Sequence, residues 1–193
     1  MTHNIQLANP FSPYTKALKA LTGKRGKSDA DMMEIGRIEW EAGLYMEKGR
    51  IVMPGRCLQA CFLAGSKKKK NGTKYKTGVV LNDDFSNFVH GGPEQITATS
   101  TREIPNPALD KFFEEFCNID MVCVSGKSKV LRFRPIFSTW EIPLVSLFYD
   151  EAQIDERTVL QILEDSGYLI GLGERRPSSP NGGTLGRFTV EQL

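Results

Sequence analysis

The segment over residues 166–188 combines arginines with glycines, a combination suited to holding phosphate groups. Gly171 and Gly173 can adopt positive φ angles, which lets a ligand approach the backbone closely. Guanidinium groups are planar and permanently charged, so they match the geometry of phosphate oxygens. The arginines of this segment are Arg175, Arg176 and Arg187. We therefore predict a phosphate-binding loop near the end of the chain.

The order of elements around this loop limits the class of ligand. The hydrophobic pattern predicts a helix over 155–170 before the glycines and a strand over 186–191 after them. Rossmann and P-loop nucleotide sites have the reverse order, in which a strand leads through glycines into a helix. The loop is therefore expected to meet a polyanion rather than to cradle a mononucleotide. A structural alternative stays open, in which the glycines only end the helix and the arginines pair with Glu164, Asp165 or Glu174.

Two further groups of basic side chains are candidates for phosphate contact. Arg132 and Arg134 alternate along a strand predicted over 130–137, which places both on one face. Pairing with acidic neighbours is the structural alternative for these two arginines. A run of lysines ends a helix predicted over 54–66, where cations interact favourably with the helix dipole, and a solvated helix end is its alternative. The lysines are Lys67, Lys68, Lys69 and Lys70.

Histidines and cysteines give little support for catalysis or metal binding. His90, beside Gly91 and Gly92, is a candidate general base, and it leaves a metal-free ribonuclease open as an alternative. The cysteines form no Cys-x-x-Cys pair, so we expect buried thiols in a reducing cytoplasm rather than zinc ligands or disulfides. They are Cys57, Cys61, Cys117 and Cys123. We predict no catalytic residue, no cofactor and no metal.

Length and composition allow a sizeable core. The chain has 193 residues, of which 40% are hydrophobic and 11 are Phe, and this length fits one domain with insertions or two small ones. The net charge at pH 7 is only +2, so the basic character is local. The first residues lack the apolar segment of a signal peptide, and no stretch approaches the roughly 18 apolar residues of a membrane span. We therefore expect a cytoplasmic protein without a membrane partner.

Turn residues and periodicity define the elements of the first half of the chain. We predict a helical insertion over 10–42 and a hairpin over 43–53 that turns at Lys48-Gly49. The helix over 54–66 follows the hairpin, and Pro54 suits its first turn because its missing N–H needs no partner there. Trp40, like Trp140, is expected in a core rather than as a base-stacking platform.

A second insertion is predicted over 82–118 and contains one helix, which Asn106-Pro107 begins. Leu109 and three phenylalanines recur at helical spacing and mark the packed face of this helix. We expect at least two of the three rings to be buried. They are Phe112, Phe113 and Phe116.

The remaining elements follow the order of an α+β, ferredoxin-like fold. A hairpin, the helix over 54–66, later strands that include 142–149, the helix over 155–170 and the strand over 186–191 trace a βαββαβ order. RNA-recognition domains share this order and bind nucleic acid on the sheet or its loops. We predict a single domain over 1–193 built on this core.

Three motifs resemble a known family. Pro54-Gly-Arg-Cys-Leu-Gln-Ala begins a helix, Arg134-Pro-Ile-Phe-x-x-Trp140 joins two strands, and Gly171-Leu-Gly173-x-Arg-Arg-Pro precedes Gly186-Arg-Phe. Together they resemble the RAMP superfamily of CRISPR RNA-binding proteins, and more narrowly its small backbone-subunit-like members that also occur in phage genomes. The resemblance implies a modified RNA-recognition fold with a glycine-rich loop near its C-terminus. The chain is too short for large thumb and finger insertions, which favours a stand-alone relative of viral origin.

These observations predict a non-catalytic protein that binds single-stranded nucleic acid, RNA in the first place, through phosphates and without strong sequence readout. Self-association and a CRISPR-like or host complex are further partners that the resemblance implies. The alternative is a phage structural or anti-defence protein that uses the same fold for self-assembly or for docking on a host complex.

Overall fold

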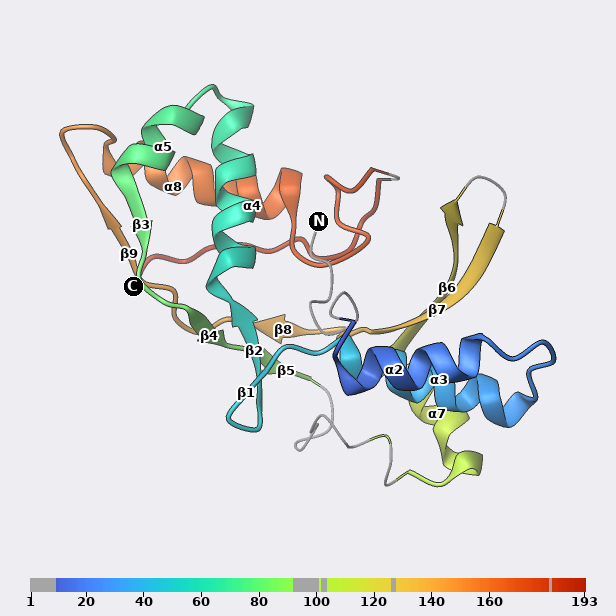
Figure 1. Ribbon diagram of the computed structural model, residues 1–193. Coiled ribbons are helices and arrows are strands. Elements are labelled where there is room, and N and C mark those ends of the chain that lie inside the picture. Colours follow the sequence, from blue (N-terminus) through green and yellow to red (C-terminus); the bar gives the residue numbers. More distant parts are fainter. Residues whose placement is uncertain (1–9, 92–100, 102–103, 126–127, 181) are drawn as a thin grey trace. The chain divides into compact units, whose positions relative to one another are not determined.

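The computed structural model describes residues 10–91, 101, 104–125, 128–180 and 182–193, and only the backbone of residues 123–125 and 128 (Figure 1). The chain divides into two compact units. We call residues 53–87 and 142–193 the C-terminal unit, and the described residues of 10–52 and 88–141 the N-terminal unit. Helices and short antiparallel sheets occur in both, so the protein is of the α+β class, as predicted.

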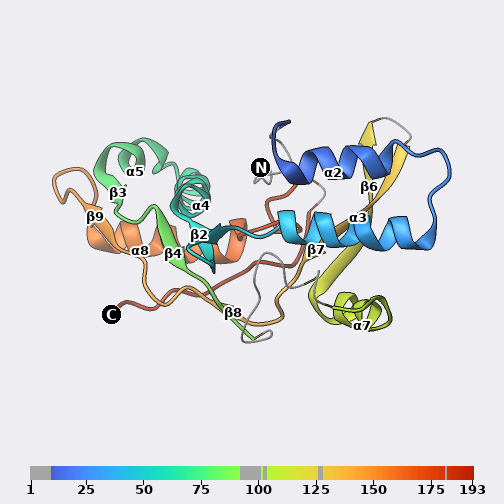
Figure 2. The ribbon, with the colours of Figure 1, turned by 60° about the horizontal axis from the view of Figure 1, so that its bottom comes forward.

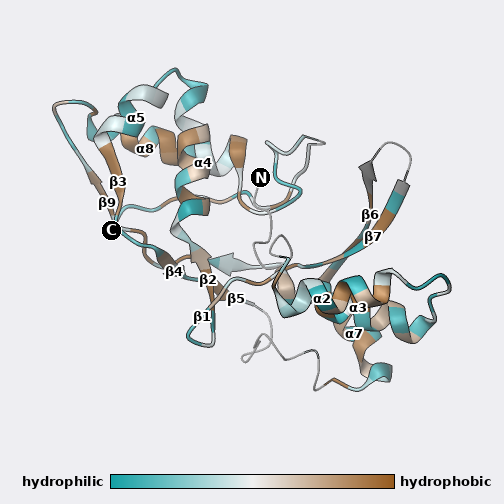
Figure 3. Cartoon of the chain, in the orientation of Figure 1, coloured by the Kyte–Doolittle hydropathy of each residue, from teal (hydrophilic) through white to brown (hydrophobic). Residues whose placement is uncertain are grey.

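The C-terminal unit is built around two packed helices, and its elements in chain order are the end of β2 (Arg50–Pro54), α4 (Gly55–Lys68), α5 (Gly72–Gly78), β3 (Val79–Leu81), β4 (Phe85–Asn87), β9 (Leu147–Tyr149), α8 (Glu156–Asp165) and the π-helix η1 (Ser166–Ile170). Helix α4 packs against both α8 and η1. Figure 3 shows the alternation of apolar and polar residues along α4 and α8 that produces this contact. Leu58, Phe62 and Ile162 are buried there.

Local signals explain where the helices of this unit begin. The Asp155 carboxylate accepts hydrogen bonds from the Thr158 N–H at 2.9 Å and its hydroxyl at 2.8 Å, which makes Asp155 the N-cap of α8. Pro54 is the N-cap of α4 rather than its first residue, so the helix begins at Gly55, one position after the predicted start. The first residue of α4, Gly55, has no room for a side chain, because a Cβ there would lie 2.0 Å from the Asp83 carbonyl oxygen.

Two strand predictions in this unit need correction. The strand predicted over 142–149 is limited to β9, which pairs antiparallel with β3 so that Val80 faces Phe148. Pro143 lacks the N–H that a continuous strand would use. The strand predicted over 186–191 does not form, although the structure describes this stretch throughout. Its backbone bonds elsewhere, since the Phe188 N–H donates to the Gly167 carbonyl at 3.3 Å.

The N-terminal unit combines helices with two-stranded ribbons, and its elements are α2 (Pro13–Thr22), α3 (Asp29–Ala42), β1 (Met46–Glu47), the start of β2, β5 (Val89–His90), α7 (Asn106–Phe116), β6 (Cys117–Ser125), β7 (Ser128–Pro135) and β8 (Trp140–Glu141). Helix α2 lies along α3, and β6 and β7 form a long antiparallel ribbon (Figures 1 and 2). Helices α2 and α3 occupy the predicted insertion over 10–42, and α7 lies where Asn106-Pro107 predicted a helix.

Turn and cap chemistry in this unit also follows the sequence. The predicted hairpin forms between β1 and β2, and Lys48 and Gly49 have φ angles of 49° and 76° in its turn. Ser28 is the N-cap of α3 and forms a capping box with Asp31. The neighbouring Lys24 and the Ser28 hydrogen bonds lower the pKa of Asp31 to about 2.

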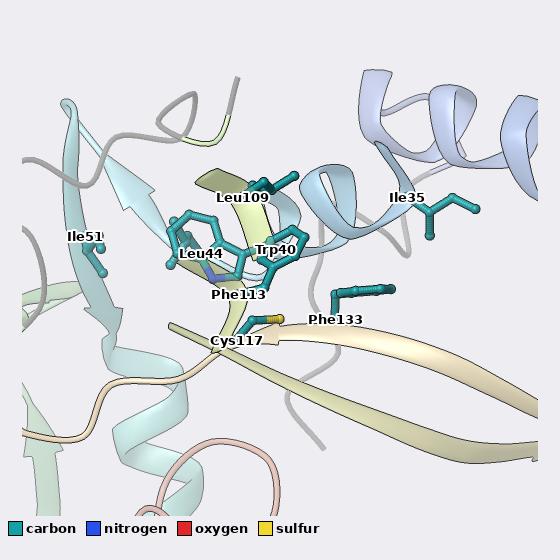
Figure 4. Packing of buried hydrophobic residues seen from close by; sticks show 8 residues of the cluster. All are labelled: Ile35, Trp40, Leu44, Ile51, Leu109, Phe113, Cys117 and Phe133. Carbon is teal, nitrogen blue, oxygen red and sulfur yellow. The ribbon is translucent and has the colours of Figure 1, made fainter. Parts of the chain in front are cut away.

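An apolar cluster between α3, α7 and the β6–β7 ribbon forms the core of the N-terminal unit (Figure 4). Trp40 is fully buried at its centre, as predicted, and its indole N–H donates to the Phe116 carbonyl oxygen at 2.8 Å. Phe113 packs against Phe133 with ring centroids 5.5 Å apart. The expectation of two buried rings on α7 is wrong, because only Phe113 is buried, while the rings of Phe112 and Phe116 lie half-buried at the rim. Among the described residues, no helix combines the length and apolar character needed to cross a membrane.

This packing predicts unequal costs for truncating the rings of α7. Phe113→Ala should lower the free energy of unfolding by about 3–5 kcal/mol, because the cavity lies inside the cluster. Phe116→Ala is the matched control and should cost less, because this ring lies at the rim. Urea unfolding followed by circular dichroism measures both. Equal losses for the two variants would contradict the packing.

Candidate functional site

The predicted phosphate-binding residues divide between the two units. The C-terminal unit contains the glycines and arginines of the loop over 171–187, which we call the glycine loop, together with Lys67–Lys70. Arg132 and Arg134 lie on β7 in the N-terminal unit. The glycine loop and the lysine run therefore belong to one unit, and Arg132 and Arg134 belong to the other.

The glycine loop begins where α8 widens into η1. The Ser166 hydroxyl donates to the Ile162 carbonyl at 2.6 Å and is fully buried. A Cβ on Gly65 would lie 2.0 Å from that hydroxyl oxygen, so the glycine allows α4 to approach η1 closely. Single turns of π-helix occur frequently at functional sites.

A buried thiol lies beneath the start of the loop. The Sγ atom of Cys61 is 3.4 Å from the Gly171 carbonyl oxygen and 3.7 Å from that of Ser166. Burial raises the pKa of Cys61 to about 12, and the charge of Arg176 opposes this shift. The thiol is protonated at neutral pH and therefore has a structural role. Cys57 and Cys117 are also buried thiols, and the side chain of Cys123 lies outside the described residues.

Backbone hydrogen bonds close the glycine loop on itself. The Leu172 N–H donates to the Gly186 carbonyl at 2.8 Å, and the Leu185 N–H donates to the Arg175 carbonyl at 3.1 Å. Ser178 binds the Ile170 carbonyl through both its N–H and its hydroxyl, at 3.3 Å and 3.0 Å. The two ends of the loop are thus held together at the end of η1.

Positive φ angles and close backbone contacts explain the glycines. Gly171, Gly173 and Gly186 have φ angles of 74°, 76° and 69°. A Cβ at Gly186 would lie 1.8 Å from the Leu172 carbonyl oxygen, and one at Gly171 would lie 2.9 Å from Pro177. No atom lies within 4 Å of a Cβ built at Gly173. Of the two predicted glycines, Gly171 is packed by the loop itself and Gly173 has open space beside it.

The arginines of the loop have different surroundings. The Arg176 guanidinium donates through Nη1 to the Gly173 carbonyl at 2.7 Å and through Nε to the Ser178 hydroxyl at 3.1 Å. Arg187 is exposed, and its Cζ lies 5.1 Å from the centre of the Tyr168 ring. Arg175 is half-buried with a φ of 53°. Arg176 thus stabilises the loop, and Arg187 presents its guanidinium on an aromatic ring.

The lysine run ends α4 on the same unit. Lys67–Lys70 are all exposed, and Lys70 has a φ of 60° where the chain turns into α5. The Lys69 ammonium lies 3.1 Å from Asp165, the last residue of α8. Asp165 was a possible partner of the loop arginines, and the structure pairs it with Lys69.

Arg132 is paired with an acidic neighbour, which is the structural alternative to phosphate contact. Its Nη1 donates to the carboxylate of Glu39, a buried residue of α3. The second Glu39 oxygen accepts the Phe133 N–H at 2.9 Å, so this carboxylate binds the open edge of β7. Arg134 is half-buried and faces Asn118 across the ribbon.

His90 belongs to an aromatic cluster that the sequence did not reveal. Its ring lies 4.7 Å from Phe137, and Phe88 stacks on Trp140 at 5.8 Å with the planes 15° apart. Burial lowers the pKa of His90, so the ring is neutral at pH 7. Within the described part of the chain, no three acidic, cysteine or histidine side chains are grouped for metal binding. Sequence reasoning also did not identify Tyr168 as a site residue. The sequence feature that could have indicated it is an aromatic residue within a glycine-rich stretch.

Comparison of the chain with models of known protein families, with curated proteins and with solved structures finds no match.

The closure of the glycine loop predicts a difference between two glycines of similar φ. Gly173→Ala should lower the free energy of unfolding by about 1–2 kcal/mol, because only the left-handed backbone is strained. Gly186→Ala should add about 1–3 kcal/mol for the collision with the Leu172 carbonyl. Thermal and urea unfolding of both variants measure the difference. A Gly186→Ala protein as stable as Gly173→Ala would show that the loop is open in solution.

Proposed function

We propose that the protein binds single-stranded nucleic acid, with RNA as the favoured form, and that it contacts the phosphate groups of the strand. The observation that carries the proposal is the closed glycine loop, which presents Arg187 and the open side of Gly173 on the unit that also bears Lys67–Lys70. Guanidinium and ammonium groups neutralise phosphates without reading the base, so we expect binding with little sequence preference. The proposal places the protein in the cytoplasm, without a catalytic step.

The order of elements in the C-terminal unit supports a ferredoxin-like core. Strand β2 leads into α4, β3 follows, and β9 leads into α8. The antiparallel pair β3–β9 corresponds to the central hairpin of a βαββαβ order, with residues 82–146 between its two strands, and the last strand of that order is the one that does not form over 186–191. The proposed core is consistent with the resemblance of the Pro54 and Gly171 motifs to the RAMP superfamily.

A second candidate function is a phage structural or anti-defence role. It is favoured by an apolar pair on one face of the β3–β9 sheet, where Val80 and Phe148 lie opposite each other and are 62% and 63% exposed. Apolar side chains at this exposure suit contact with a second protein or a second copy of the chain. A high ratio of absorbance at 260 to 280 nm in the purified protein favours nucleic acid. A normal ratio in a self-associated protein favours the second role.

The proposed contact predicts a salt-dependent affinity that removal of lysines weakens. Binding of a fluorescein-labelled oligoribonucleotide should fall with salt, with a log–log slope of about −0.7 per neutralised phosphate. The double variant Lys67→Ala, Lys68→Ala should reduce the magnitude of this slope by up to about 1.4. Both side chains are exposed at the end of α4, so the fold should be retained.

The matched control is Lys16→Ala, Lys19→Ala, which removes the same charge from exposed positions of α2. It should leave affinity and slope close to those of the wild type. Equal losses in both double variants would show that net charge alone drives binding. Wild-type protein that does not bind at low salt would refute the proposed function.

A further inference from the structure

An aromatic ring and a guanidinium group are stacked on the surface of the C-terminal unit. Tyr168 belongs to η1 and is 65% exposed, and the Cζ of Arg187 lies over its ring at 5.1 Å from the centre. Arg187 is exposed as well. An exposed cation–π pair contributes little to folding, so stability does not explain this arrangement.

The fold holds this pair in place through the backbone on both sides. The Phe188 N–H donates to the Gly167 carbonyl, and the Leu172 N–H donates to the Gly186 carbonyl. Tyr168 directly follows Gly167, and Arg187 lies between Gly186 and Phe188, so these bonds bring the two side chains together.

Steric constraints make the two glycines necessary for this arrangement. A Cβ at Gly167 would lie 2.0 Å from the Phe188 carbonyl oxygen, and one at Gly186 would lie 1.8 Å from that of Leu172. Any larger residue would separate the segment that carries Tyr168 from the segment that carries Arg187. The pair is therefore organised before a ligand arrives, which reduces the entropy lost on binding.

The chemistry of the pair suits an unpaired nucleobase. Bases stack on tyrosine rings and on guanidinium planes, and this contact tolerates any sequence because every base has a π-face. Bases inside a duplex already stack on each other and are not accessible in this way. The guanidinium can also contact the phosphate that follows a stacked base.

We infer that Tyr168 and Arg187 form a stacking platform that binds one unpaired base of a single strand. This inference rests on the proposed function and adds to it the contact by which a single strand is preferred over a duplex. The phosphate contacts supply affinity for either form, and the platform supplies the preference for the single strand.

The test measures binding of labelled oligouridine to the full-length protein by fluorescence polarisation. Tyr168→Ala should weaken binding about 5- to 150-fold, the range for loss of one base–aromatic stack. Tyr168→Phe keeps the ring and should bind close to wild type. The salt slope should stay unchanged, because the substitution removes no cationic group.

Two further measurements separate stacking from damage to the loop. Leu169→Ala alters the neighbouring residue of η1, which is 39% exposed, and should keep wild-type affinity. An oligomer of abasic sugar–phosphate units should bind wild type and Tyr168→Ala equally, because it has no base to stack. A loss for Leu169→Ala as large as for Tyr168→Ala would overturn the platform in favour of a structural role.

Failure of the inference is distinguishable from failure of the proposed function. If Tyr168→Ala binds oligouridine like wild type while Lys67→Ala, Lys68→Ala weakens binding, the platform is refuted and phosphate binding stands. If wild-type protein binds neither oligouridine nor the abasic oligomer at low salt, both are refuted.

Discussion

The backbone contact between Leu172 and Gly186 is the constraint on which the C-terminal segment depends. With the 2.8 Å hydrogen bond formed, the ends of the glycine loop meet, and Arg187 lies beside η1. The contact tolerates no side chain at Gly186, because the carbonyl oxygen of Leu172 lies 1.8 Å from the position of a Cβ. Glycine at this position allows two segments of the chain to approach each other closely. Gly171 and Gly173 were predicted to serve the approach of a ligand, and of these two Gly173 has open space beside it, whereas Gly171 is packed by the loop itself.

Buried charges have a comparable role in the N-terminal unit. Glu39 and Glu41 are almost fully buried on α3, where Glu39 binds Arg132 and Glu41 accepts the Thr101 hydroxyl at 2.6 Å. Arg37 donates to the Ile104 carbonyl at 2.7 Å. A buried carboxylate that lost its partner would carry a large desolvation cost, so these contacts tie α3 to β7 and to the segment before α7. The guanidinium of Arg132 therefore has a structural role in the N-terminal unit, as the partner of Glu39.

Helices were predicted well because their signals are local. Asp155, Pro54 and the Asn106-Pro107 pair mark helix starts by satisfying or lacking backbone N–H groups, and those effects need no knowledge of the rest of the chain. Strands depend on partners distant in sequence. The apolar stretch around Phe188 has a strand-like pattern, yet its N–H finds the Gly167 carbonyl instead of a neighbouring strand. The sequence pattern cannot reveal that preference, because it depends on how the fold places Gly167 and Phe188, which lie far apart in the sequence.

The candidate site shows the same division between residue type and placement. The sequence identified arginines and lysines whose side chains suit phosphate. It could not show which of these side chains are already bound to other groups of the protein. Arg176 donates two hydrogen bonds within the loop, and Lys69 is paired with Asp165. Arg187 is exposed and lies over the ring of Tyr168. Since a surface ion pair is weak, Lys69 can still exchange Asp165 for a phosphate at little cost. Arg176 holds the carbonyl of Gly173 within a closed loop, so its release would disturb the loop that positions Arg187. The proposed phosphate contact of this unit therefore depends more on the lysine run and Arg187 than on the pair Arg175 and Arg176, although that pair is the more conspicuous in the sequence.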